Sequence, residues 1–249
     1  MSAEEDVTVG AVLSDATRIY FRSFVRFAPV AILAHVPVML LDAFSVIAPP
    51  DVASSGLTQI STFLGTVALA ITSAYVVPPV MSELGHRASP TFSQVSSRVG
   101  AALVTAWITN FIVGLGLLCF IVPGLVLGVW YCVAIAAAVG EGLGAGKAME
   151  RSKTLTEGHR GTAVLLSLAY GFLLLGSIAI TVVPGLYFAI EDPTNTSTSP
   201  PLLVVSAVVP TAVQALFVAY GAAIFTVFYV RLRALKDGID AAAIANVFS

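Results

Sequence analysis

Four polar side chains lie inside the long apolar runs of this sequence and are the first candidates for chemistry: His35, Asp42, Asn110 and Gln214. His35 and Asp42 are seven residues apart, which is about two turns of an α-helix and therefore one helix face. A stripe of such groups can line a substrate path across a membrane. More often, intramembrane polar groups join neighbouring helices through hydrogen bonds worth about 0.6 kcal/mol each. The sequence leaves both interpretations open.

Two carboxylates, Glu83 and Glu141, stand where apolar runs end. Such a group could hold a headgroup amine, a cation or a proton. Alternatively, Glu141 pairs with Arg151, with Arg160 or with a helix N-terminus, and so orients the short helix that follows. We favour the ion pair as the interpretation of Glu141. We give Glu83, its counterpart earlier in the chain, the same interpretation.

Ser152 is followed seven residues later by His159, which suggests a nucleophile with a base. No carboxylate and histidine stand in the order of a nucleophile-elbow enzyme, so we expect Ser152 to pack closely or to cap a surface helix. His35 is the one histidine inside an apolar run, which argues against a metal cluster. We therefore predict no catalytic residue, no metal and no cofactor. An enzyme acting within the membrane would need two or more of these inner carboxylates and histidines around one pocket: Glu83, His86, Glu141 and His159.

The elements that must position these residues are membrane-spanning helices. The chain has 249 residues, of which 57% are hydrophobic and 10% are charged. About 20 apolar residues cross the hydrocarbon core of a bilayer as a helix. The hydrophobic runs therefore predict one all-α membrane domain over 1–249, a polytopic transmembrane helical bundle with about six spans. We place the spans at about 24–47, 57–82, 100–121, 125–140, 162–190 and 202–230, followed by a cytoplasmic tail at 231–249.

The basic residues predict the orientation of these spans. All twelve Lys and Arg residues fall on one side of the membrane if the chain crosses it six times. By the positive-inside rule that side is cytoplasmic, so we expect both termini in the cytoplasm and a cell-membrane location, in a bacterial inner membrane. The basic clusters would meet membrane lipids through their anionic headgroups. No extended basic face is present, which argues against nucleic-acid binding.

Short amphipathic helices are expected on the cytoplasmic side of the bundle. Residues 8–22 carry apolar side chains at helical spacing and Asp15, Arg18 and Arg22 on the other side, which is typical of an interfacial helix. Ser89-Pro90 resembles a helix cap and a first-turn proline, and so predicts a second surface helix at about 90–98. A third is expected at about 145–156.

Residues 100–140 are almost continuously apolar and are broken by Pro123-Gly124. This length is about twice one crossing, so it predicts a hairpin of two spans. A re-entrant hairpin would also return the chain to the same side, and the charge pattern does not distinguish the two. The motif Val-Pro-Gly-Leu at 122–125 reappears at 183–186. We therefore predict an internal repeat of a surface helix plus a hairpin, with a looser copy at 8–82.

A set of residues between 121 and 161 resembles the signature of a membrane-domain family: Ile121, Val122, Pro123, Gly124, Trp130, Glu141, Ala148, Arg151, Ser152, Leu155, Thr156 and Gly158. That family comprises the glycerophosphoryl diester phosphodiesterase membrane domain and YciC-like bacterial inner-membrane proteins. The ending at 229–233 also resembles the family's. The proline that follows the tryptophan in many relatives is replaced here by Tyr131-Cys132-Val133.

The resemblance implies a six-span inner-membrane bundle. Some relatives add a soluble phosphodiesterase domain, which needs clustered carboxylates and histidines that this sequence does not contain, so we expect a non-enzymatic protein. Its expected role is lipid contact, envelope upkeep or scaffolding of a membrane partner. The alternative is a subunit of a transporter or channel, which requires the four intramembrane polar residues to converge on a water-accessible cavity. Gly124 and Gly128 have the spacing of a dimer face, which would make the protein a homo-oligomer.

Overall fold

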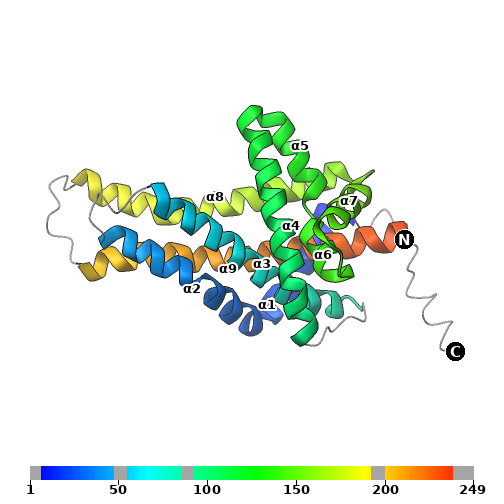
Figure 1. The fold of residues 1–249 in the computed structure, drawn as a ribbon, viewed down its shortest axis with the longest axis horizontal. Helices are drawn as coiled ribbons and strands as arrows, with labels where there is room; N and C mark the ends of the chain where they lie inside the picture. The colour runs from blue at the N-terminus through cyan, green and yellow to red at the C-terminus, as the bar shows by residue number, and fades with distance from the viewer. Residues whose placement is uncertain (1–6, 48–54, 86–91, 192–199, 238–249) are drawn as a thin grey trace.

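The computed structural model describes residues 7–47, 55–85, 92–191 and 200–237, and these residues form helices joined by short turns (Figure 1). Six segments of this described part are long and apolar enough to cross a membrane, which confirms the predicted all-α architecture of a multi-pass membrane protein. The helices are α1 (Val9–Arg22), α2 (Phe24–Ile47), α3 (Ser55–Glu83), α4 (Phe92–Cys119), α5 (Ile121–Tyr131), α6 (Ala134–Glu141), α7 (Ala145–Thr156), α8 (Arg160–Glu191) and α9 (Pro200–Asp237).

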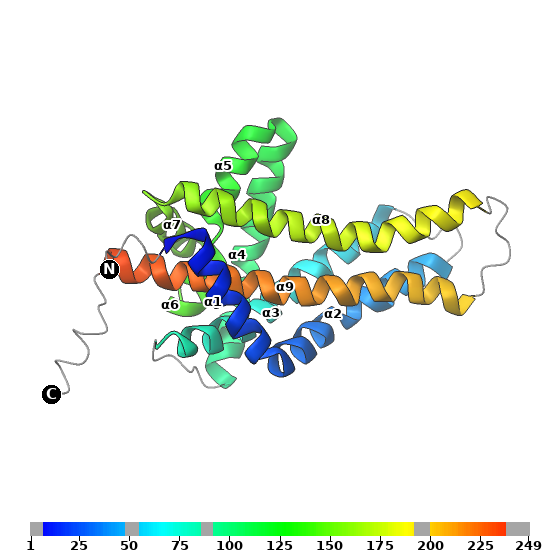
Figure 2. The same cartoon turned by 180° about the vertical axis from the view of Figure 1, so that it is seen from behind.

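Helices α2, α3, α8 and α9 run side by side along the long axis, and α9 lies in their middle (Figures 1 and 2). α9 packs against α1, α2, α3 and α8. Ala215, Ala219 and Ala223 of α9 are fully buried and follow one another at a spacing of four residues. Residues four apart share a helix face, and small side chains let helix backbones approach closely. This alanine face explains how one helix accommodates so many neighbours.

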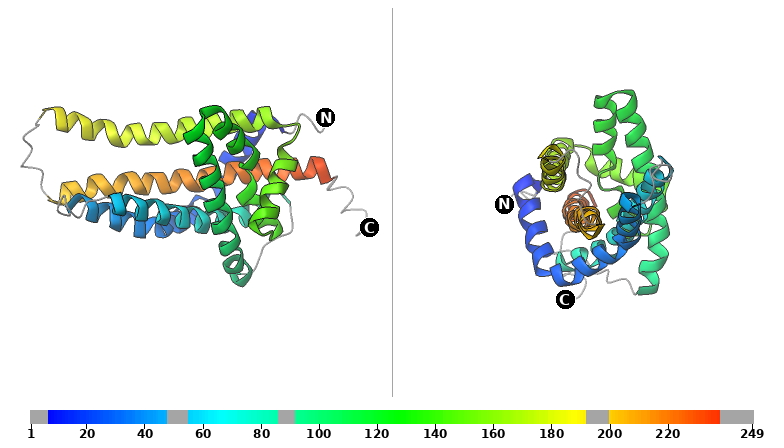
Figure 3. Two further views of the ribbon diagram at one scale, coloured as in Figure 1. Left: turned by 45° about the horizontal axis from the view of Figure 1, so that its top comes forward. Right: turned by 90° about the vertical axis from the view of Figure 1, so that its left-hand side faces the viewer.

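Helices α4 and α5 form a hairpin that crosses the bundle instead of running along it, as the end-on view in Figure 3 shows. The turn lies at Phe120, which has an extended backbone, three residues before the expected break at Pro123-Gly124. Proline is tolerated there because the N–H groups of a first helical turn need no intrahelical partner. A Cβ on Gly124 would lie 2.5 Å from the backbone nitrogen of Leu117, so this glycine lets the two legs touch. The face predicted to meet a second copy is therefore packed against α4 of the same chain at Gly124.

One expected boundary in this region is wrong, and one expected span contains a bend that the sequence did not predict. The described part of the surface helix predicted at 90–98 is the beginning of α4, because Gly100 costs only about 1 kcal/mol inside a helix and no proline interrupts it. The expected cap at Ser89-Pro90 lies outside the described residues. The span predicted at 125–140 corresponds to the apolar segment Val122–Glu141, which is long enough to cross a membrane but is bent into α5 and α6 at Cys132 and Val133. No breaker residue marks this bend in the sequence. It follows from packing, since the small residues of α6 are buried among α3, α4, α7 and α9 while much of α5 stays exposed.

The other predicted elements compare closely with the structure. The spans at 24–47, 57–82 and 162–190 correspond to α2, α3 and α8, and the surface helix at 145–156 is α7. The last span is longer than expected, because α9 continues to Asp237 and so takes in the first part of the predicted tail. The rest of that tail lies outside the described residues.

The two Val-Pro-Gly-Leu motifs occupy different settings. The first, at 122–125, begins α5 directly after the hairpin turn, whereas the second, at 183–186, lies within α8, which continues to Glu191. The internal repeat stays a prediction. The elements that carry many of the basic residues lie together. α1, α7, the start of α8 and the end of α9 all gather at one end of the bundle (Figures 1 and 2). We call this the basic end.

Candidate functional site: a groove between the helices

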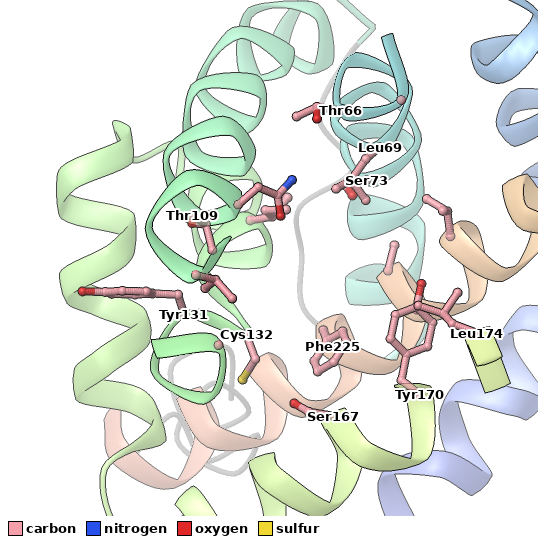
Figure 4. A pocket seen from close by; sticks show the side chains of 18 of the residues that line it. Thr66, Leu69, Ser73, Thr109, Tyr131, Cys132, Ser167, Tyr170, Leu174 and Phe225 are labelled. Atoms are coloured by element: carbon pink, nitrogen blue, oxygen red, sulfur yellow. The ribbon is translucent and has the colours of Figure 1, made fainter. Parts of the chain in front are cut away.

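A groove of about 1190 Å³ lies between α3, the α4–α5 hairpin, α8 and α9. Figure 4 shows Thr66 and Ser73 of α3, Thr109 of α4, Ser167 of α8 and Phe225 of α9 around it. Most of the lining is apolar, and hydroxyl groups are distributed along the walls. The volume exceeds that of typical small-molecule pockets, which is about 300–1,000 Å³.

The rim of the groove is apolar as well. Leu117, Val122, Leu125 and Val126 of the hairpin and Leu168 of α8 line the groove, and each is between 40% and 70% exposed. Exposed side chains of this kind in a membrane protein face hydrocarbon rather than water. The opening between α8 and the hairpin is therefore suited to entry from the side, out of a lipid phase.

All four intramembrane polar residues predicted from the sequence line this one groove: His35, Asp42, Asn110 and Gln214. They come from α2, α4 and α9, so only the tertiary structure brings them together. The hydrogen bonds recorded among the described residues join none of the four to another. Asn110 and Gln214 are both exposed.

Asp42 joins three helices. Its carboxylate accepts hydrogen bonds from Ser61 Oγ of α3 at 3.0 Å and from Thr211 Oγ1 of α9 at 2.7 Å. For this residue the interpretation as a link between helices is confirmed. Charged carboxylates receive stronger hydrogen bonds than neutral acceptors, so the two hydroxyls stabilise a group that a membrane interior would otherwise disfavour.

His35 is 4% exposed and lies two helical turns before Asp42. Its Nδ1 is 2.8 Å from the carbonyl oxygen of Ala31. A carbonyl oxygen only accepts, so Nδ1 donates the hydrogen bond and Nε2 is left as the acceptor of the neutral ring. This bond satisfies one polar atom of the ring within α2 itself and fixes its tautomer.

Glu141 anchors a network at the basic end. Its Oε1 accepts hydrogen bonds from Arg151 Nε at 3.0 Å and from Tyr229 Oη at 2.7 Å. Arg151 also pairs with Asp237, and Arg233 Nε lies 3.8 Å from the same Glu141 oxygen. Burial would lower the pKa of Arg151, but the hydrogen bonds and charges of Asp237 and Glu141 outweigh it and raise that pKa. The predicted Glu141–Arg151 pair is thus confirmed, and it joins α6, α7 and α9.

The remaining candidates for chemistry do not meet in the groove. Glu83 lies 3.6 Å from Arg22 across the α1–α3 contact, and the pair is largely exposed. Glu83, Glu141 and His159 are not among the residues that line the groove, and His86 lies outside the described residues. Both inner carboxylates are therefore paired with arginine, as the interpretation favoured from the sequence requires.

The residues that carry the family resemblance tie the hairpin to α7. Ser152 is fully buried, and its Oγ donates to the carbonyl oxygen of Trp130 at 2.8 Å. The last carbonyls of a helix lack intrahelical partners, and Trp130 stands one residue before the end of α5. Ser152 therefore packs closely, as expected, and satisfies one of these carbonyls. Leu155 is also fully buried, and Gly158 follows α7 with φ +86°, a conformation that favours glycine.

The structure adds two features that sequence reasoning missed. Lys153 Nζ and Arg160 Cζ lie 4.8 Å and 5.3 Å from the centre of the Trp130 ring. Between α8 and α9, a Cβ on Gly221 would lie 2.4 Å from the ring of Tyr170, so glycine is needed for this contact. No local sequence pattern predicts these two contacts, because each joins residues far apart in the chain.

The helix predicted at 8–22 packs on the protein with its apolar face. Val12, Ala16, Ile19 and Tyr20 of α1 are buried, and the helix lies against α9. Asp15 and Arg231 form an ion pair at 2.5 Å across this contact. Lipid contact by α1 therefore depends on its opposite side, where basic side chains are exposed.

The groove, its apolar rim and the paired charges of the basic end are thus the features from which a function must be argued. Comparisons of the chain with family models, with curated proteins and with solved structures found no match.

Proposed function

We propose that this protein is a non-enzymatic integral membrane protein that holds a membrane lipid in its groove and so serves lipid contact or envelope upkeep. The observation that carries the proposal is the groove itself, with about 1190 Å³ of space, mostly apolar walls and an apolar rim. When an acyl chain moves from the bilayer into the groove, it exchanges contacts with lipid for contacts with protein. It breaks no hydrogen bonds, because it makes none in either place. Thr109 Oγ1, beside the groove, is buried without a hydrogen-bond partner among the described residues, so a bound molecule with a polar atom could supply one.

The basic end supports a cytoplasmic location for both described ends of the chain. Arg18 and Arg22 of α1 expose about three quarters of their side-chain surface there, next to Phe21 at 67%. Exposed arginine beside exposed phenylalanine is suited to a lipid surface with negative headgroups. Together with the resemblance at 121–161, this arrangement is the basis for proposing a bacterial inner-membrane protein.

The test is lipid occupancy of the full chain purified from its native membrane, measured by native mass spectrometry. Ser167→Trp places an indole in the groove, and we expect the number of retained lipids to fall. Leu175→Trp adds the same group on the same helix outside the groove, at a position that is 61% exposed, and should retain the wild-type number. Equal occupancy in both variants and the wild type would overturn the proposal.

A second candidate is a subunit of a transporter or channel. It is favoured by the convergence of His35, Asp42, Asn110 and Gln214 on one groove. Cysteine placed at Asn110 or Gln214, in a chain whose own cysteines are replaced by serine, should react with a water-soluble thiosulfonate if water fills the groove. A groove filled with lipid predicts protection at both positions, so this experiment separates the two functions.

A further inference from the structure

Two cations lie against Trp130, a residue that lines the groove. Lys153 of α7 and Arg160 at the start of α8 are both exposed, and both face the indole ring of Trp130. Arg160 and Trp130 line the groove directly. Each cation gains about 0.5–1 kcal/mol from the face of an aromatic ring at an exposed site, which positions the charge without neutralising it.

Among the described residues, these two charges have no acidic partner, in contrast to the arginines that hold the basic end together. Arg151 pairs with Glu141 and Asp237, and Arg231 pairs with Asp15. Among the described residues, no ion pair is recorded for Lys153 or Arg160. Two like charges held beside one ring repel each other, so an anion placed between them is favoured.

The apolar wall begins next to this charge. Arg160, Val164 and Leu168 succeed one another at a spacing of four residues along α8, and all three line the groove. They therefore form one stripe, about 12 Å long, that starts with a guanidinium and continues with hydrocarbon. This polarity matches a molecule with an anionic head and an apolar tail.

We propose that the groove binds an anionic phospholipid, with its phosphate between Lys153 and Arg160 beside Trp130 and one acyl chain along Val164 and Leu168. This inference rests on the proposed lipid-binding function and adds the chemistry of the headgroup. The polar end of the lipid lies at the level of α7, where the basic residues meet the membrane surface. The lipid enters between α8 and the α4–α5 hairpin.

The experiment uses the full delipidated chain and native mass spectrometry with added phosphatidylglycerol or phosphatidylcholine of identical acyl chains. We expect the wild type to prefer phosphatidylglycerol. Lys153→Gln or Arg160→Gln should each weaken phosphatidylglycerol binding about fivefold, and the double variant about 30-fold, with little change for phosphatidylcholine. Lys147→Gln is the matched control, because Lys147 is also an exposed lysine of α7 and contacts no aromatic ring in the described part of the chain.

The outcomes separate the two proposals. Equal binding of both lipids, with loss of both in Ser167→Trp, would overturn the anionic headgroup and leave the lipid groove standing. If Ser167→Trp binds lipid as well as the wild type does, the proposal that the groove holds lipid is overturned, and the inference falls with it. A loss in Lys147→Gln as large as in the double variant would mean diffuse surface attraction and would also overturn the inference.

Discussion

The basic end and the groove use polar groups in opposite ways. At the basic end, Glu141 is paired with arginine, and Phe228, Tyr229 and Leu232 beside it are fully buried. In the groove, Asn110 and Gln214 are exposed. One region is closed by paired charges, whereas the other stays open. We therefore expect the basic end to contribute more to the stability of the bundle than the open part of the groove.

The largest expected effect concerns the α4–α5 hairpin that forms one side of the groove, and it is all-or-none. Cys119, at the tip of the α4–α5 hairpin, is exposed between Leu118 and Phe120, which are 83% and 74% exposed. Because the hairpin crosses the bundle and its tip is apolar, we expect this thiol to lie in hydrocarbon. In a Cys132→Ser variant, a membrane-impermeant maleimide should leave Cys119 unmodified from either side of the membrane.

The positive control is Glu191→Cys at the end of α8, with both native cysteines replaced by serine, which should react from one side. Reaction of Cys119 from that same side would instead make the hairpin a complete crossing. A groove wall that ends within the hydrocarbon would then be excluded. This experiment also decides between the two placements of 100–140 that the charge pattern leaves open.

Removing the central carboxylate should have the largest effect on stability. Glu141→Ala leaves Arg151, Arg233 and the hydroxyl of Tyr229 without their shared acceptor. Breaking a partly buried ion pair in this way should lower the free energy of unfolding by about 3 kcal/mol, measured by denaturant titration in detergent micelles. Glu150→Ala, at an exposed position of α7, should change it by less than about 0.5 kcal/mol. Similar losses in the two variants would show that the network does not close the basic end.

The seam between α8 and α9 should be sensitive to a single methyl group. Gly221→Ala would place a Cβ 2.4 Å from the Tyr170 ring, so one helix must shift, at a cost of about 2 kcal/mol in unfolding free energy. Gly171→Ala on α8 meets nothing within 4 Å and should be neutral or slightly stabilising. Thermal unfolding of the two variants in the same detergent measures the difference. A Gly221→Ala protein as stable as the control would show that this wall of the groove is loose.

The smallest expected effect concerns the hydrogen bond between Ser152 of α7, at the basic end, and Trp130 of α5, which lines the groove. Ser152→Ala removes the hydrogen bond to the Trp130 carbonyl and leaves that carbonyl unsatisfied, which should cost about 1 kcal/mol. Thr154→Ala, on the exposed side of α7, provides the comparison. The same unfolding assay applies, and hydrogen exchange of α5 should increase only in Ser152→Ala. Unchanged exchange would mean that the hairpin is held by other contacts.

The sequence predicted the features that depend on local composition. The positions of α2, α3 and α8 could be predicted from the apolar runs, because a helix that crosses a membrane needs about 20 apolar residues. The Glu141–Arg151 pair could be predicted because Glu141 ends α6 and Arg151 follows nearby in the chain, in α7. The bend at Cys132 could not be predicted, because no local residue marks it and the packing of α6 determines it. The convergence of the four polar residues depends on how α2, α4 and α9 meet, and no spacing within one helix contains that information.

The central position of α9 has a consequence for biogenesis. Every helix that packs against α9 precedes it in the chain, and 116 residues separate Glu83, at the end of α3, from Pro200. At a synthesis rate of about 10 residues per second, α9 is synthesised on the order of ten seconds after α2 and α3, two of the helices that it packs against. During that interval the face that α3 will present to α9 is covered only by lipid or by an insertion factor. The nascent protein is therefore most exposed to wrong pairing and to proteolysis just before α9 enters the membrane.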